Sequence, residues 1–179
     1  KGSKGVGTFG GSEDHTAILN CEADYISQFS YCPIVFHKKM KIPEDYAFVI
    51  ASSGVDAEKT GTAMEKYNRA STLAQKITDL WTEETGFDDD CLFDAVVRSE
   101  NTVKRIKQII SKYESNKYAP QDLLDRFIQF YVENFEIIPE ASRCINKKEF
   151  EKFGNIVDKS QSLTTYKLKN QIPETEYLA

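Results

Sequence analysis

A cluster of glycines followed by a carboxylate stands near the start of the chain. The segment Gly10-Gly11-Ser12-Glu13-Asp14-His15 combines backbone that can approach a ligand closely with an acidic side chain that can accept a hydrogen bond. Ser12 can cap a helix that begins near Asp14, and the helix dipole favours negative charge in its first turn. Two interpretations follow: Asp14 binds a ligand, or it only compensates the exposed backbone N–H groups of the helix.

The same region contains Gly5, Gly7 and Gly10 at the spacing of the dinucleotide-binding fingerprint G-x-G-x-x-G. That fingerprint requires a strand before it, a helix after it and an acidic residue at the end of the next strand. Only four residues precede Gly5, and no acidic residue ends a following strand at the required distance. The sequence therefore argues against a Rossmann domain.

Composition narrows the class of protein. Of the 179 residues, 40% are apolar and 28% are charged, which suits a globular chain with one core, or one domain and part of another. The net charge of −5 and the pI of about 5.2 argue against a nucleic-acid partner. The sequence shows neither a bilayer-spanning apolar run nor a signal peptide. We expect a soluble, cytoplasmic protein that binds neither nucleic acid nor membrane.

The spacing of the thiols and imidazoles predicts no metal site. The four cysteines are spread without a CxxC motif, so the pattern supports neither a disulfide framework nor a zinc site, and we expect reduced thiols. No second histidine or carboxylate set at metal spacing accompanies His15, and His37 is expected at the surface. The cysteines are Cys21, Cys32, Cys91 and Cys144.

Two regions in the first third of the chain predict strands. Residues 24–31 are rich in β-branched and aromatic side chains, and Pro33 separates them from residues 34–36, so two strands or one bent strand are expected. The segment Tyr46–Ser52 is almost continuously apolar, which predicts a strand of the buried kind.

Helices dominate the remainder. Apolar residues recur at three and four residues over Ala63–Trp81, Val96–Tyr113, Leu124–Phe135 and Phe150–Ser160, and a further helix is expected near Pro173. Asn146 with Glu149 three residues later resembles a capping box at the start of the fourth helix. Strands followed by helices predict an α+β fold in which helices cover a small β-sheet.

Several of these segments together resemble one family. The glycine and carboxylate segment resembles the G-x-x-D-[QH] motif of galactokinase, and Tyr46–Ser52 resembles the strand that follows it. Lys66-Tyr67-Asn68-Arg69 is similar to that family's K-Y-N-x-R motif, and Phe150–Leu163 is similar to its helix with a phenylalanine-glycine step. These matches occur in the family's order and span most of the chain, so the sequence resembles a galactokinase-like sugar kinase of the GHMP superfamily.

The resemblance implies an incomplete kinase. Residues 1–40 would be the end of the GHMP kinase N-terminal domain with the active-site loop, and residues 41–179 most of the C-terminal domain. The family's sugar-entry motif, its ATP phosphate loop and its late glycine loop have no counterpart in the sequence. The isolated chain is therefore expected to be inactive, with ATP and Mg²⁺ bound mainly by parts of the family fold that the sequence lacks.

The resemblance also implies an activity and its residues. The whole protein would transfer the γ-phosphoryl group of ATP to the anomeric hydroxyl of galactose or a related sugar. Asp14 matches the family's candidate general base, while Gly11 and Tyr67 match its sugar-contacting residues. His15 stands where galactokinases commonly have glutamine, which leaves arabinose, uronic acids and amino sugars open as substrates. The alternatives are a catalytically weak relative that senses sugar and ATP, and a protein-interaction domain.

Overall fold

The computed structural model describes residues 11–56 and 62–179, with side chains in the second range described from residue 68 onward. Its elements are α1 (Glu13–Asn20), β1 (Tyr25–Tyr31), β2 (Ile34–Lys41), α2 (Thr62–Thr85), α3 (Leu92–Val97), α4 (Thr102–Ser111), α5 (Pro120–Val132), η1 (Glu133–Ile137), α6 (Ile138–Lys147), α7 (Phe150–Leu163), η2 (Thr164–Leu168) and α8 (Pro173–Leu178). The turns η1 and η2 are π-helical continuations of α5 and α7. Helices thus accompany one small sheet, which confirms the α+β class and does not identify a GHMP kinase fold.

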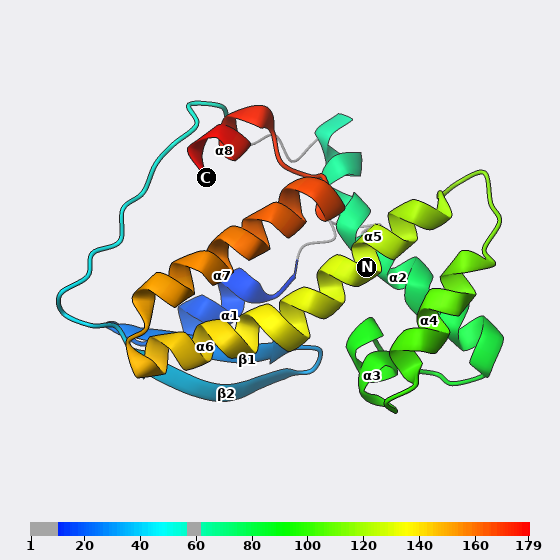
Figure 1. Cartoon of the computed structure of the whole chain (residues 1–179), viewed down its shortest axis with the longest axis horizontal. Coiled ribbons are helices and arrows are strands. Elements are labelled where there is room, and N and C mark those ends of the chain that lie inside the picture. Colours follow the sequence, from blue (N-terminus) through cyan, green and yellow to red (C-terminus); the bar gives the residue numbers. More distant parts are fainter. Residues whose placement is uncertain (1–10, 57–61) are drawn as a thin grey trace.

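The sheet is a two-stranded antiparallel hairpin. β1 pairs with β2 from Tyr25 opposite Lys41 to Tyr31 opposite Ile34, with an irregularity after Gln28. Helix α6 packs against the hairpin, where the Ser142 hydroxyl lies 3.1 Å from Oε1 of Gln28 in the middle of β1. Figure 1 shows the hairpin beneath α6 and α7, with its turn reaching toward α3. The first two predicted strands are confirmed, and the second extends beyond its predicted end.

The core lies between α2, α3, α4 and α5. Ile77 of α2, Ile106 of α4 and Phe127 of α5 are almost completely buried against one another's helices. These residues recur at helical spacing, so each helix presents one apolar face to the others. The helix predicted over Ala63–Trp81 is therefore confirmed as α2, and the helix predicted after Pro120 is confirmed as α5. None of the described helices is both long and apolar enough to cross a bilayer.

The prediction of a buried strand at Tyr46–Ser52 is wrong. This segment has no regular secondary structure, and Phe48, Val49 and Ile50 are 75%, 91% and 94% exposed. A strand becomes buried only when neighbouring strands complete its backbone hydrogen bonds. Within the described residues the sheet contains only β1 and β2, and the apolar segment pairs with neither of them, so it forms no strand.

Two predicted helix boundaries also differ. The helix predicted over residues 96–113 is two helices, α3 and α4, because the chain turns where the Ser99 carbonyl accepts a bond from the Thr102 N–H group at 3.1 Å. Asn146 does not cap α7. Its amide donates to the Ser142 carbonyl within α6, which ends at Lys147 and is followed by Lys148 with a left-handed φ of 58°.

A buried ionic cluster joins α5 to the end of α7. The Asp125 side chain is only 5% exposed and accepts bonds from Lys167 at 2.9 Å, Lys169 at 2.8 Å and Gln121 at 2.8 Å. Burial opposes ionisation of this carboxyl group, but the bonds from the two lysines and the glutamine outweigh it and lower its pKa from 3.8 to about 2. The ionised carboxylate therefore stabilises the folded state.

We expect Asp125→Asn to reduce the free energy of unfolding by about 2 kcal/mol at neutral pH. Because the pKa of Asp125 is lowered in the folded state, the stabilisation by its carboxylate is complete above about pH 4. This stabilisation disappears as the pH falls toward 2. Urea denaturation at several pH values measures this, with Asp158→Asn on the exposed face of α7 as the control. A stability difference that did not shrink between pH 4 and pH 2 would contradict the assignment.

Candidate functional site

Asp14 lies in the first turn of α1, as its sequence context predicts. The helix begins after Ser12, whose carbonyl accepts the Thr16 N–H group at 2.8 Å, although the Ser12 side chain makes no capping bond. Glu13 and Asp14 are both exposed in this turn. Their charges lie at the positive end of the helix dipole, which stabilises them there. The Asp14 carboxylate is accessible to a ligand that approaches from solvent.

Gly11 precedes this helix and lies against an aromatic ring. A Cβ atom at residue 11 would be 2.7 Å from Cε2 of Tyr31, so a larger residue would have to displace the ring. Tyr31 ends β1 and is 66% exposed. Close to the start of α1 there are therefore a backbone position packed against an aromatic ring and, three residues further along the chain, an exposed carboxylate.

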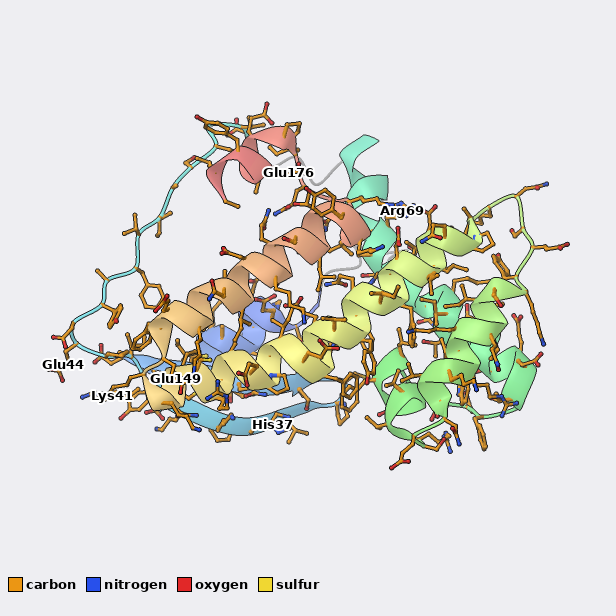
Figure 2. The ribbon with its side chains drawn as sticks, viewed as in Figure 1. His37, Lys41, Glu44, Arg69, Glu149 and Glu176 are labelled. Atoms are coloured by element: carbon orange, nitrogen blue, oxygen red, sulfur yellow. The ribbon has the colours of Figure 1, made fainter. Side chains whose placement is uncertain are left out.

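Tyr67 belongs to α2, as predicted, but its side chain lies outside the described residues. The predicted sugar-binding cavity shared by Asp14 and Tyr67 therefore stays a prediction. Its neighbour Arg69 is described: Nη2 lies 2.8 Å from Oδ2 of Asp122, which fixes α2 to the start of α5. Figure 2 shows Arg69 where these two helices meet.

Both histidines are exposed. His15 follows Asp14 on α1, and His37 lies on β2, at the surface as expected and as Figure 2 shows. Two shallow hollows occur elsewhere on the described surface, one between residues 52–53 and α8 and one along α4. Neither includes Asp14. Gly5, Gly7 and Gly10 lie outside the described residues.

Sequence reasoning missed one cluster of side chains that could hold a metal. The ligand atoms of Cys32, Cys91 and Asp94 lie within 4.8 Å of one another, and all three residues are half-buried. Cys32 is in the hairpin turn, while Cys91 and Asp94 are at the start of α3. Burial raises the pKa of the Cys91 thiol to about 12. The two cysteines are 59 residues apart, so no local spacing could reveal the cluster.

Comparison with known proteins identifies no relative. The chain matches no family model, no curated protein and no solved structure.

Proposed function

We propose that this chain forms the sugar-binding side of an ATP- and Mg²⁺-dependent sugar 1-kinase of the galactokinase type, acting in the cytoplasm. The observation that carries the proposal is the exposed Asp14 carboxylate in the first turn of α1, three residues after the glycine that lies against Tyr31. The predicted division into residues 1–40 and 41–179 belongs to the same proposal. Galactose is the first candidate substrate.

Asp14 and Tyr31 offer complementary surfaces to a sugar. A hexose presents hydroxyl groups that donate hydrogen bonds and an apolar face of C–H groups, and ligand sites commonly pair apolar lining with a few placed polar groups. The exposed Tyr31 ring supplies apolar surface, and the carboxylate supplies an acceptor. In this role Asp14 accepts or polarises the proton of the reacting hydroxyl, which makes its oxygen a better nucleophile.

The start of α1 does not suit a nucleotide phosphate. The beginning of a helix is the usual backbone site for phosphate, but Glu13 and Asp14 place two carboxylates in the first turn of α1, and these would repel it. Under the proposal, ATP and Mg²⁺ are held by the family's phosphate loop, and this chain positions the sugar. Phosphoryl transfer depends largely on such positioning and on charge neutralisation.

The test is sugar-dependent release of ADP by the full-length protein that carries this chain, with ATP and Mg²⁺ present. We expect release only when a sugar is added, with galactose, arabinose, galacturonate and galactosamine compared as substrates, and a sugar 1-phosphate as product. If no sugar stimulates release, the kinase proposal fails. A rise in melting temperature with sugar and ATP but without turnover would indicate a sensor, and no rise would indicate an interaction domain.

A further inference from the structure

The half-buried thiols of Cys32 and Cys91 and the Asp94 carboxylate meet at the contact between the hairpin turn and α3. Sγ of Cys91 lies 3.5 Å from Oδ2 of Asp94 and 3.7 Å from the Cys32 carbonyl oxygen. The three ligand atoms all lie within 4.8 Å of one another. Figure 1 shows the hairpin turn next to the start of α3, so two distant parts of the sequence supply the cluster.

The spacing suits tetrahedral zinc. With Zn–S of about 2.3 Å and Zn–O of about 2.1 Å, two ligands of one tetrahedron are separated by about 3.6 Å when one is sulfur and the other oxygen. The 3.5 Å between Sγ of Cys91 and Oδ2 of Asp94 agrees with this sulfur-to-oxygen separation. Sγ of Cys32 needs to move by no more than about 1 Å, because two sulfur ligands lie about 3.8 Å apart in such a site.

The chemistry of the three groups also favours a cation. Thiolates select borderline and soft metals such as zinc, and a carboxylate is a common third ligand. A disulfide would use both sulfur atoms but would give the Asp94 carboxylate no role. Coordination to zinc deprotonates the two thiols, and the divalent cation then offsets most of the repulsion between the thiolates and the carboxylate in this half-buried place.

We propose that Cys32, Cys91 and Asp94 form a zinc site whose fourth position is occupied by water. Binding one Zn²⁺ releases the two thiol protons to solvent and leaves the site with a net charge of −1. The metal joins the hairpin turn to the start of α3, and so it ties the sheet to the helical core. This inference goes beyond the proposed kinase function and shares no residue with it.

The test uses the 179-residue chain, reduced and freed of metal, and Co²⁺ as a spectroscopic probe. We expect one equivalent of Co²⁺ to produce thiolate-to-cobalt charge-transfer absorption and the visible bands of tetrahedral cobalt, and Zn²⁺ to remove both. Cys32→Ser and Cys91→Ser should each abolish the charge-transfer band of the two-thiolate site, and Asp94→Asn should weaken binding at least about tenfold. Cys21→Ser, at an exposed cysteine outside the cluster, should behave as wild type.

A second measurement on the wild-type chain avoids any dependence on variants that fold poorly. Zn²⁺ should protect Cys32 and Cys91, but not Cys21, from alkylation by iodoacetamide, as read by peptide mass spectrometry. Three results would overturn the proposal: no cobalt–thiolate absorption in the reduced wild-type chain, unchanged absorption in Cys91→Ser, or a Cys32–Cys91 disulfide that forms in air despite equimolar Zn²⁺.

Discussion

Asp14→Asn in the full-length protein is expected to lower kcat by about 10²- to 10⁴-fold while leaving the sugar dissociation constant within a few-fold of wild type. The substitution keeps the shape of the side chain and its place in the first turn of α1 but removes the anionic proton acceptor. A group that acts mainly in the transition state affects turnover more than ground-state binding. ADP release measures kcat, and calorimetry measures sugar affinity.

The neighbouring residue supplies a matched control for this prediction. Glu13 is an exposed carboxylate in the same turn, so Glu13→Gln makes the same change of charge at the same end of the helix. If both residues only stabilise the helix dipole, each substitution costs about 0.3–1 kcal/mol of stability and neither changes kcat. Equal effects of the two substitutions on turnover would therefore reject a special role for Asp14.

Phe127→Ala is expected to produce the largest loss of stability, about 3–5 kcal/mol in the free energy of unfolding. Phe127 is completely buried in the core formed by α2, α3, α4 and α5, and its ring lies 6.4 Å from that of Tyr131. Removing it takes away its apolar contacts and leaves a cavity that the surrounding helices can close only in part. Urea denaturation followed by helical circular dichroism gives the value.

Phe48→Ala is the control for the same chemical change at an exposed position. Phe48 lies in the segment without regular structure after the hairpin, so its truncation should alter the free energy of unfolding of the 179-residue chain by less than about 0.5 kcal/mol. A loss as large as that of Phe127→Ala would show that residues 46–52 are buried in solution and would contradict the fold described above.

Local sequence signals located most of the helices but missed α6 and some helix ends. Helical periodicity located α2 and α5 because apolar spacing of three and four residues defines one face whatever that face later contacts. The break between α3 and α4 was missed because a chain reversal of a few residues leaves the apolar spacing on either side intact. The predicted cap at Asn146 was wrong because the Asn146 amide donates a hydrogen bond within α6, which continues one residue beyond it to Lys147.

The candidate site likewise has features that the local sequence predicts and contacts that it does not predict. Its local part, the carboxylate at the first turn of α1 and the glycine before it, follows from residue types and capping preferences within a short segment. The approach of Tyr31 to Gly11 requires the chain to pass through α1 and return along β1. The meeting of Cys32 with Cys91 requires the hairpin turn to reach α3.

The sequence by itself determined where most of the helices form, that they accompany a small β-sheet, and that an acidic side chain opens α1. Those features depend on interactions between residues a few positions apart. Only the tertiary structure decided that the apolar segment after the hairpin stays exposed, that Asp125 is buried between two lysines, and that two distant thiols share one place with a carboxylate. Such outcomes depend on which distant surfaces pack together, because burial and proximity are properties of the whole arrangement and of no single segment.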